Sequence, residues 1–433
     1  MGSIWTQHCE IKERPPLQRD LNTEVAVIGA GMAGVLTAHA LQNAGKRVVV
    51  LEADRIAGGQ TRNTTAKITS QHGLIYEKLL REFGRERARL YWEANQAALG
   101  RYRSLGQEIP CHFEVRDNYV YSVDDRAKLE RELEALEKLG IPARLEPEPA
   151  IPLPTAGAVQ FADQAQFHPL EFAAGIAREL NIREETRVAS FEGTHVRTNR
   201  GKVRAEKIIV ATHFPILNKH GSYFLKMYQH RSYVLALEGG PQVEGMYVDE
   251  SGDGLSFRNF GDTLLLGGGS HRTGKQGGGW KELEDFRALC CPQSRETARW
   301  ATQDCMTLDG APYIGQYSRN TPDLYVATGF NKWGMTSSMA AAMVLCDLVQ
   351  ERDNPWAEVF SPSRTILRPQ LLVNAVESTL NLITPTVPRC PHLGCALKWN
   401  RAEHTWDCPC HGSRFGEDGT LLNGPATGPL PEK

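Results

Sequence analysis

Two short segments near the C-terminus carry side chains that bind metals. Residues 390–395 read CPHLGC and residues 408–413 read CPCHGS. Together they give the pattern C-x-H-x15-C-x-x-H, formed by Cys390, His392, Cys408 and His411. Two cysteines and two histidines can make a tetrahedral structural zinc site. Each segment also has an additional cysteine, Cys395 or Cys410, and this repeated layout indicates a different metal centre.

The whole layout closely resembles a Rieske [2Fe–2S] centre, in which two thiolates bind one iron and two imidazoles bind the other. The resemblance implies that Cys395 and Cys410 join the two loops by a disulfide. It also implies that Ser413 hydrogen-bonds a cluster sulfur. Phe415 stands where cytochrome bc-type Rieske proteins carry a tyrosine, so one such bond is missing. Imidazole ligands raise the reduction potential into a range of about −150 to +300 mV, and the missing bond should lower it.

The segment before the first ligand is short for a Rieske domain. Only residues 383–389 precede Cys390, where Rieske domains usually have several strands. We expect a shortened Rieske domain at 383–433, after a linker or docking segment at 351–382. The base of this domain must be absent or supplied by the rest of the chain. We therefore predict that the domain docks tightly and does not swing.

A second chemical pattern lies near the N-terminus, where residues 24–52 read EVAVIGAGMAGVLTAHALQNAGKRVVVLE. Gly29, Gly31 and Gly34 follow an apolar strand and open a helix, as in dinucleotide-binding sites. They allow a tight turn, the approach of the backbone to a pyrophosphate and close packing of helix on strand. Glu52 ends the next strand, 18 positions after Gly34, and can accept a hydrogen bond from a ribose hydroxyl. Its charge disfavours NADP, whereas FAD and NAD both remain open.

The composition excludes several classes of protein. The chain has 433 residues, enough for two to three domains, and its net charge of −2 argues against a nucleic-acid partner. No run reaches the 18 apolar residues of a membrane span, and the longest candidate is 339–349. The residues before Glu24 contain no apolar signal region, so we expect a cytoplasmic protein. A homo-oligomer is compatible with the sequence.

Four segments together resemble the glycine/D-amino-acid oxidase (DAO) family of FAD enzymes. They are GAGMAG with Glu52, FADQAQFHP (161–169), KIIVAT (207–212) and DGAPYIG…YVATGFNKWGM (309–335). The similarity covers residues 20–350 and implies an α/β fold with a discontinuous Rossmann-like FAD domain and an antiparallel β substrate domain. The small all-β Rieske module is added to this fold. The FAD domain would comprise residues 20–75, 155–215 and 300–350, and the substrate domain residues 76–154 and 216–299.

The same resemblance implies which residues contact FAD. They are Gly29, Gly31, Gly34, Glu52, Val188, Gly310, Gly334 and Met335. Thr336 belongs to the same helix start as Gly334, and Thr212 ends the KIIVAT strand beside the cofactor. The Thr-rich run after Glu52 can wrap a polar ring system, which makes Thr61, Thr65 and Lys67 candidate contacts. A solvated loop is the alternative.

The candidate catalytic residues are few. Lys67 could stabilise the anionic reduced flavin or activate oxygen, or be an ordinary surface lysine. His72 and His168 are candidate bases, although the removal of a hydride from a neutral amine requires none.

The chain departs from the family in two places. Cys305 does not have the offset from Asp309 of the cysteine that tethers flavin in sarcosine oxidases, so we expect a noncovalent flavin and a packed thiol. The arginine that binds a substrate carboxylate also has no clear position. The candidates are Arg62, Arg231 and Arg258.

The remaining segments predict the elements that position these residues. We expect an extended arm over 1–23 and helices at 75–106, 124–139, 169–180 and 369–380. Antiparallel strands are expected at 233–237, 246–250, 255–260 and 263–269. The glycines at 267–269 lack a following helix and an acidic-tipped strand, so we reject a second nucleotide site.

Taken together, these features predict a flavin-dependent dehydrogenase that oxidises a C–N bond of a small amine or amino acid. Electrons would pass from FAD through the cluster to an external one-electron carrier, because a plain oxidase reduces oxygen directly and needs no cluster. Two alternatives remain open. One is a reductase, in which electrons enter at the cluster and leave from FAD to an unsaturated substrate. The other is a non-enzymatic redox sensor, although no DNA-binding motif is present.

Overall fold

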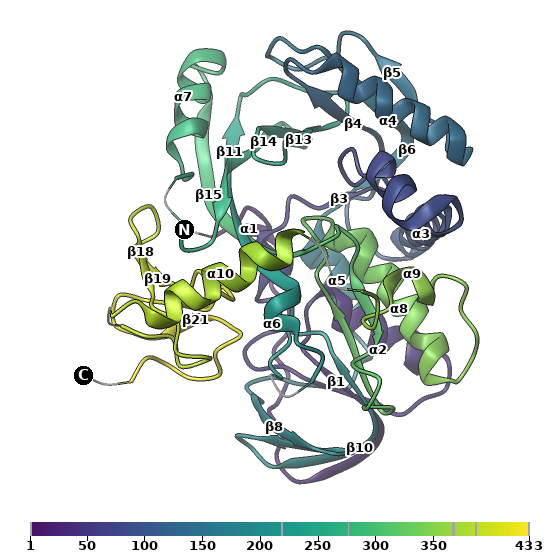
Figure 1. The fold of residues 1–433 in the computed structure, drawn as a ribbon, viewed down its shortest axis with the longest axis vertical. Coiled ribbons are helices and arrows are strands. Elements are labelled where there is room, and N and C mark those ends of the chain that lie inside the picture. Colours follow the sequence, from purple (N-terminus) through teal and green to yellow (C-terminus); the bar gives the residue numbers. More distant parts are fainter. Residues whose placement is uncertain (1, 218–219, 276, 366–368, 386–387, 432–433) are drawn as a thin grey trace.

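The computed structural model contains two large sheets and one small sheet (Figure 1). The first lies in the lower part of Figure 1, the second in the upper part, and the small C-terminal sheet at the left. The residues that the structure describes are 2–217, 220–275, 277–365, 369–385 and 388–431.

The first sheet has the strand order β16-β17-β10-β1-β2-β7, with β8 and β9 beside β10. Its strands are β1 (Leu21–Ile28), β2 (Val48–Leu51), β7 (Ile182–Arg183), β8 (Val188–Glu192), β9 (His195–Thr198), β10 (Lys202–Val210), β16 (Tyr313–Gln316) and β17 (Leu324–Thr328). Strand β1 pairs in parallel with β2 and β10, and β10 with β17. All four residues of β2 are buried, because helices cover a parallel sheet on both faces. The predicted return of the KIIVAT segment to the first sheet is confirmed.

Helices α2 (Met32–Asn43) and α8 (Gly334–Val349) pack against each other over this sheet. Each follows a strand through a short turn, so both begin at the carboxyl edge of the parallel strands. Helix α5 (Pro169–Ala177) packs against α2, with Pro169 at its first turn as predicted. The two predicted strand–turn–helix units are therefore confirmed and lie side by side.

The second sheet has the order β15-β11-β14-β13-β12-β4-β6-β3, with β5 beside β6. Its strands are β3 (Lys67–Ile68), β4 (Glu114–Ser122), β5 (Arg144–Glu146), β6 (Gly157–Gln166), β11 (Met227–Glu238), β12 (Met246–Asp249), β13 (Ser256–Phe260), β14 (Thr263–Arg272) and β15 (Arg295–Thr307). Neighbours are antiparallel except β12 and β4. The antiparallel sheet is therefore confirmed. Strand β6, which we had assigned to the FAD part, pairs into this second sheet, while the division into domains stays a prediction.

Helices α3 (Tyr76–Glu108) and α4 (Arg126–Leu139) pack against each other beside this sheet, as predicted. Asp125 caps the start of α4 by accepting a hydrogen bond from the Lys128 amide, and Gly140 ends the helix with a φ of 69°. Gly84 interrupts α3 with a φ of 81°. Both helices are longer than needed to cover the sheet edge, and α4 extends beyond it in Figure 1.

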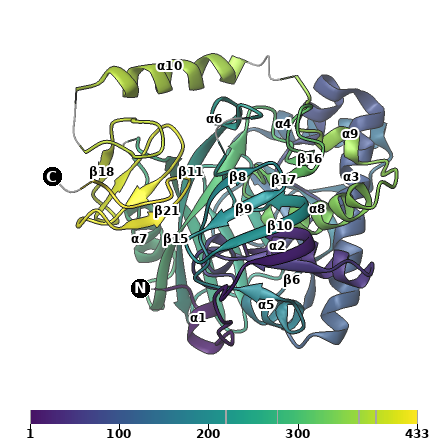
Figure 2. The same ribbon diagram turned by 90° about the horizontal axis from the view of Figure 1, so that it is seen from below.

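The C-terminal module is a four-stranded antiparallel sheet in the order β18-β19-β20-β21. Its strands are β18 (Lys398–Asn400), β19 (Thr405–Asp407), β20 (Arg414–Phe415) and β21 (Leu421–Asn423). Figure 2 shows the module beside β11 and β15 of the second sheet. Helix α10 (Pro369–Ile383) leads into it, close to the predicted helix. The C-terminal module therefore lies against the second sheet.

Several helices differ from the prediction. Helix α1 (Trp5–His8) lies in the arm that we had predicted as extended, because the buried indole of Trp5 donates a 2.7 Å hydrogen bond to the Thr64 carbonyl. Helix α7 (Lys281–Cys290) lies in a region predicted as strands, and it packs on β14 through Leu283. The short helices are η1 (Gln60–Asn63), α6 (Tyr223–Lys226) and α9 (Ala357–Phe360).

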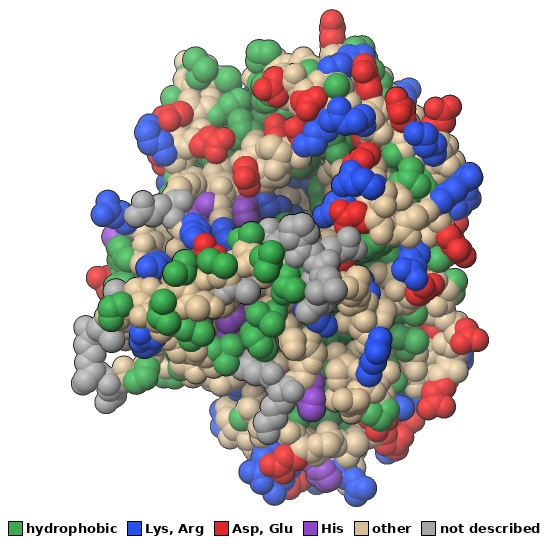
Figure 3. Space-filling view, viewed as in Figure 1, with side chains coloured by type: hydrophobic (Ala, Val, Ile, Leu, Met, Phe, Trp, Pro, Cys, Tyr) green, Lys and Arg blue, Asp and Glu red, His purple; other side chains and the backbone are tan. Residues whose placement is uncertain are grey.

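Helix α10 turns an apolar face outward, seen as a row of green side chains in Figure 3. Its exposed apolar residues are Leu372, Val373, Val376, Leu380, Leu382 and Ile383. Within the described part of the chain, we find no helix with both the length and the apolar character needed to cross a membrane.

Candidate functional site

A cavity of about 1010 Å³ joins the three sheets. It is lined by the glycine turn after β1, by β11 and β15 of the second sheet, and by the loop after β21 of the C-terminal module. Pockets for drug-sized ligands occupy about 300–1,000 Å³, so this cavity can hold a dinucleotide together with a small substrate.

The glycine turn is shaped for close approach. Gly29 has a φ of 102°, and a side chain there would meet the Ala211 carbonyl oxygen at 2.8 Å. A side chain at Gly34 would lie 1.8 Å from the Gly29 carbonyl oxygen, so only glycine lets the helix pack this closely. These contacts confirm the mechanical roles that the pattern predicted for the two glycines and fit a dinucleotide.

Glu52 braces the same turn. Its carboxylate accepts hydrogen bonds from the Ala30 amide at 2.7 Å and the Asp54 amide at 2.9 Å. Burial raises the pKa of this carboxyl. Glu52 therefore fixes the backbone of the turn in addition to its predicted contact with a ribose, a role that the sequence did not reveal.

Most of the predicted FAD contacts line the cavity. They are Gly29, Gly31, Glu52, Thr61, Thr65, Lys67, Val188, Thr212, Gly334 and Met335. The other three, Gly34, Gly310 and Thr336, lie behind it. Gly310 has a φ of 87° and donates to the Thr307 hydroxyl at 3.1 Å. The individual contacts with FAD stay predictions.

His72 and Lys67 both line the cavity but differ in their hydrogen bonds and in their pKa values. His72 stacks on Trp333 at 5.2 Å, and its ring nitrogens lie 2.6 Å from the Tyr91 hydroxyl and 2.9 Å from the Thr336 hydroxyl. Burial lowers its pKa to about 3. Burial also lowers the pKa of Lys67, to about 7, and the Arg258 guanidinium adds to this shift. His72 is thus a neutral, fully bonded ring, whereas Lys67 can change charge near neutral pH; their catalytic roles stay predictions.

The remaining candidate histidine and arginines lie elsewhere. His168 caps the start of α5 and does not line the cavity. Arg231 binds Glu403 of the C-terminal module, and Arg258 donates to the Thr65 and Ala66 carbonyls at 2.7 and 3.0 Å. Arg62 lines the cavity but is exposed. Of the three candidates, only Arg62 therefore lines the cavity, while Arg231 and Arg258 bind other groups outside its lining.

Cys305 fits the expected packed thiol. It is buried, its sulfur lies 3.5 Å from the Met227 sulfur, and burial raises its pKa to about 12.

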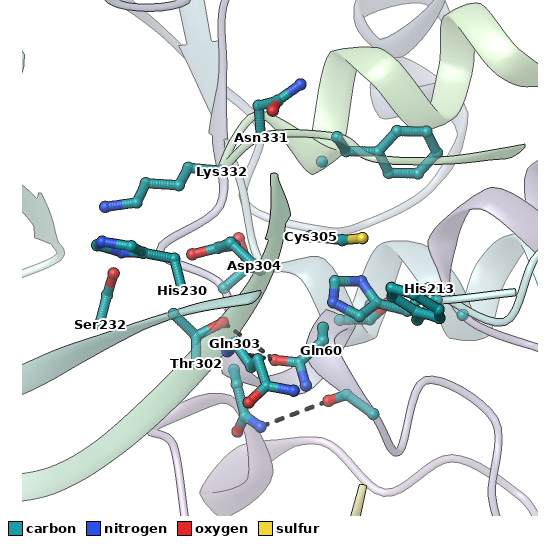
Figure 4. A pocket seen from close by; sticks show the side chains of 18 of the residues that line it. Gln60, His213, His230, Ser232, Thr302, Gln303, Asp304, Cys305, Asn331 and Lys332 are labelled. Carbon is teal, nitrogen blue, oxygen red and sulfur yellow. Dashed lines mark hydrogen bonds between the residues drawn. The ribbon is translucent and has the colours of Figure 1, made fainter. Parts of the chain in front are cut away.

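Polar side chains that we had not selected form the other end of the cavity. His230 and Ser232 come from β11, Asp304 from β15 and Lys332 from the loop before α8. Figure 4 shows these four side chains turned toward one another, while the Cys305 sulfur points away. The sequence held no motif for this group, because the sheet pairing and the loop bring it together.

The two cysteine–histidine loops have the same backbone layout. Gly394 donates its amide to the Cys390 carbonyl, and Gly412 donates to the Cys408 carbonyl, both at 2.9 Å. The two glycines have φ values of 78° and 80°. Ser413 ties a third loop to this pair, because its hydroxyl accepts a 3.0 Å hydrogen bond from the Ala426 amide. The repeat seen in the sequence is therefore a structural repeat.

The side chains at the loop tips fit an iron–sulfur cluster. All four cysteines there are buried, and the sulfurs of Cys395, Cys408 and Cys410 lie within 4.8 Å of one another. The rings of His392 and His411 are 5.0 Å apart. Burial lowers their pKa values to about 3 and about 4, so both rings are neutral, as iron ligands must be. Among the described residues, neither nitrogen of the buried His411 ring has a hydrogen-bond partner, which leaves the ring available to a metal.

The pairing of Cys395 with Cys410 stays a proposal. Both are free thiols in the structure. Phe415 is fully buried in the module, at the position where the resemblance implies a missing hydrogen bond.

Buried charges hold the module on the second sheet. Arg231, which is 2% exposed, donates from Nε to Glu403 at 3.0 Å, and Arg414 binds the same carboxylate at 2.9 Å. Arg414 also binds Asp407 at 2.9 Å. Burial opposes ionisation of Glu403, but the two guanidinium groups hold its pKa below the usual value. The predicted tight docking is thus built on an Arg–Glu–Arg–Asp chain.

Two side chains connect the cavity to the histidines that we predict as metal ligands. Phe214, which lines the cavity, lies 5.8 Å from the His411 ring and 6.4 Å from the His392 ring. Gln303, also in the lining, donates a 2.8 Å hydrogen bond to the Gly412 carbonyl. One layer of side chains therefore separates the cavity from the metal loops.

Comparisons with known proteins agree with these sites. Residues 24–348 match the family model "FAD dependent oxidoreductase" (DAO), and residues 368–432 match the "Rieske [2Fe-2S] domain". The chain is 35% identical to the "Putative Rieske 2Fe-2S iron-sulfur protein YhfW" of Bacillus subtilis, with 99% of this chain and 96% of the relative covered.

Solved structures share the fold of the larger part. Glycine oxidase from Geobacillus kaustophilus has a TM-score of 0.67 at 19% identity, covering 80% of this chain and 99% of its own. L-proline dehydrogenase from P. horikoshii has a TM-score of 0.65 at 18% identity, covering 80% and 98%. The chain is an oxidoreductase that carries FAD and a [2Fe–2S] cluster, and it belongs to the DAO family of FAD-dependent oxidoreductases, with a Rieske domain at its C-terminal end.

Proposed function

We propose that the protein is a dehydrogenase that oxidises a C–N bond of a small amine or amino acid and delivers the electrons through its cluster to an external one-electron carrier. The bound FAD supplies hydride acceptance, and the bound cluster supplies one-electron transfer. The observation that carries this proposal is the short connection from the cavity to the metal loops through Phe214 and Gln303.

The two predicted histidine ligands differ in solvent exposure, and this difference indicates a direction of electron transfer through the cluster. His411 is 1% exposed and packs against Phe214 and Phe224 of the flavin oxidoreductase part of the chain. His392 is half-buried, and its neighbours Pro391 and Leu393 are exposed. We infer that electrons enter on the His411 side and leave on the His392 side, where a carrier can approach.

The relatives support the substrate class without identifying it. Structural neighbours are named as a glycine oxidase, an L-proline dehydrogenase and L-amino acid deaminases, and each of these names gives an amino acid as the compound acted on. The volume of the cavity, about 1010 Å³, leaves room for a substrate of this size beside a dinucleotide.

The test is anaerobic titration of the holoenzyme with a panel of amines and amino acids. The flavin should bleach with at least one compound, and an added one-electron acceptor should restore its colour faster than oxygen does. If oxygen restores it faster than any one-electron acceptor, the protein is an oxidase and the carrier proposal is wrong.

The proposed bridge between Cys395 and Cys410 has its own test. Thiol titration of the denatured, metal-free chain should give two fewer reactive thiols before reduction than after it. An equal count would exclude the bridge.

A further inference from the structure

The polar end of the cavity is built on one row of the second sheet. Asp304 of β15 is paired directly with His230 of β11, and His230 is paired with Arg272 of β14. Directly paired residues of antiparallel strands place their side chains on the same face. Asp304 and His230 therefore face the same part of the cavity, which both of them line.

Lys332 reaches this place from a strained loop. Asn331 and Lys332 have φ values of 50° and 73°. Asparagine tolerates this left-handed region, whereas it is unfavourable for lysine. The Asn331 side chain holds the loop by accepting from the Thr307 amide at 2.7 Å and donating to the Gly310 and Gly329 carbonyls at 3.0 and 2.7 Å. Strain of this kind persists where a function needs the side chain in place.

The Lys332 ammonium has donor capacity to spare. It donates to the Gly252 carbonyl at 2.6 Å and to the Ser270 hydroxyl at 3.4 Å. An ammonium group has three donors, so one remains for a ligand. These two partners hold Nζ at the wall formed by β14 and the loop after β12.

The Asp304 carboxylate is the matching group of opposite charge. Among the described residues, it makes no hydrogen bond and has no cation within 4.0 Å. Lys332 is near enough to act on its charge, and so is Arg231, whose guanidinium is bound to Glu403. Figure 4 shows Lys332 above His230 and Asp304 beside it. A carboxylate left unpaired so close to an ammonium marks a place for a ligand that carries both charges.

We propose that Lys332 and Asp304 bind the two ends of an α-amino acid: the Lys332 ammonium binds the substrate carboxylate, and the Asp304 carboxylate binds the substrate ammonium and accepts its proton. This inference rests on the proposed function and narrows it from amines in general to α-amino acids. Asp304 is then a catalytic residue, and Lys332 determines specificity.

The chemistry balances with groups already present. One N–H bond of the substrate ammonium breaks, and its proton moves to an Asp304 oxygen. The nitrogen lone pair then forms the C=N bond as the Cα–H bond breaks, and that hydrogen leaves with both electrons to the bound FAD. The product is a protonated imine, which water hydrolyses to a 2-oxo acid and an ammonium ion when the substrate is a primary amino acid.

The electrostatics suit a proton acceptor. Burial raises the pKa of Asp304 to about 6, and the charges of Lys332 and Arg231 oppose this rise. The other titratable groups nearby are His230, His271, Arg272 and Asp253, and the Asp253 carboxylate lies 3.5 Å from His230 Nε2. Burial lowers the pKa values of His230, His271 and Arg272. Burial also lowers the pKa of Lys332, while the carboxylates of Asp304 and Asp253 oppose that shift. Asp304 is therefore ionised at neutral pH and protonated below about 6, while His230 stays neutral.

The first test measures binding without turnover. Acetate and propionate, which cannot be oxidised, are titrated into the oxidised holoenzyme by calorimetry. Lys332→Met should weaken their binding at least tenfold, Lys332→Arg should restore most of it, and Lys281→Met, a surface control on α7, should leave it unchanged. If Lys332→Met binds acetate as well as the parent, the proposed carboxylate site is wrong. Lys332→Gln serves if the methionine variant loses its flavin.

The second test measures anaerobic flavin reduction by glycine, alanine and proline against methylamine, ethylamine and pyrrolidine. The parent should prefer the amino acids, and its rate at low substrate should rise with pH through about 6 and then level off. Asp304→Asn should lose the rise in rate near pH 6 and reduce its flavin more slowly, by about 100-fold or more, at pH 7. Its rate should instead increase with the fraction of substrate present as free amine, up to alkaline pH. Asp285→Asn, on the surface of α7, is the control.

The outcomes separate the two proposals. If no amine or amino acid reduces the flavin, the proposed function fails and this inference fails with it. If the simple amines reduce it as fast as the amino acids, or if Asp304→Asn keeps the parent's pH profile, the proposed function stands and this inference alone is overturned.

Discussion

The side-chain amide of Gln303 donates a 2.8 Å hydrogen bond to the carbonyl oxygen of Gly412, the residue that follows the predicted metal ligand His411. Gln303 belongs to β15 and lines the cofactor cavity, so this bond joins the wall of the cavity to the backbone of a cluster loop. Its oxygen accepts from the Thr273 hydroxyl at 3.2 Å, which fixes the orientation of the amide.

Replacing Gln303 by methionine removes this donor with little change in volume. The buried Gly412 carbonyl then lacks its partner, which should cost about 1–3 kcal/mol of unfolding free energy and loosen the loop. We expect cluster reduction to slow severalfold while flavin reduction by substrate is unchanged, as measured by rapid-mixing absorbance. Gln350→Met, at the end of α8, is the control, and equal slowing of both steps would contradict the role given to Gln303.

Replacing Arg231 by methionine tests the docking of the Rieske module. The change leaves the largely buried Glu403 with Arg414 as its ion-pair partner and a 3.4 Å hydrogen bond from Asn400. Breaking a buried ion pair costs about 3–5 kcal/mol. We expect the unfolding free energy to fall by an amount near the lower limit, about 3 kcal/mol, because Glu403 keeps its pair with Arg414. Denaturant unfolding followed by cluster absorbance measures it. Arg295→Met breaks an exposed pair with Glu238 and should cost less than about 1 kcal/mol.

Metal analysis separates the iron–sulfur centre from the zinc site that the ligand set alone would allow. The purified protein should contain two irons and two acid-labile sulfides per chain. Cys408→Ser should lose the cluster and keep FAD, because the glycine turn and the cavity wall at Glu52 are separate from the cluster loops. Stoichiometric zinc, or loss of FAD together with the metal, would contradict this assignment.

The buried histidines predict acid sensitivity. His72 has a folded pKa of about 3, far below that of an exposed imidazole, about 6.5. The unfolded chain therefore binds a proton below pH 6.5 that the folded chain does not, and the unfolding free energy falls as the pH falls. Each such group contributes up to about 1.4 kcal/mol per pH unit, or about 2 kcal/mol between pH 6.5 and 5.

His72→Gln should reduce this dependence by that amount, whereas His195→Gln, at an exposed position on β9, should not change it. Chemical unfolding at pH 7, 6 and 5 measures the slopes. A variant with the parent's slope would show that His72 is protonated in the folded protein.

Local patterns in the sequence predicted the parts of the fold that depend on neighbouring residues. The glycines at 29 and 34 have steric roles that any β–turn–α unit of this kind requires, and the two metal loops repeat one backbone layout. The same holds for the capped helix α4, whose start and stop are both encoded within a few residues.

Contacts between distant segments could not be predicted in this way. Arg231 was a candidate for the substrate carboxylate, but it pairs with Glu403, and only the docking of the module brings them together. Asp304 and Lys332 were missed because sheet register and a strained loop, neither visible in composition, place them in one cavity. Residues 5–8 form a helix where we expected an extended arm. The buried indole of Trp5 donates a hydrogen bond to the carbonyl of Thr64, which is distant in the sequence.

The most direct test of the account is a single-turnover experiment without oxygen or any external acceptor. The holoenzyme is mixed with an amino acid that reduces the flavin, and the cluster is followed by electron paramagnetic resonance after rapid freezing. We predict that the cluster becomes reduced after the flavin, at a rate independent of protein concentration, because both lie in one folded chain. A flavin that is fully reduced beside a cluster that stays oxidised would contradict the account.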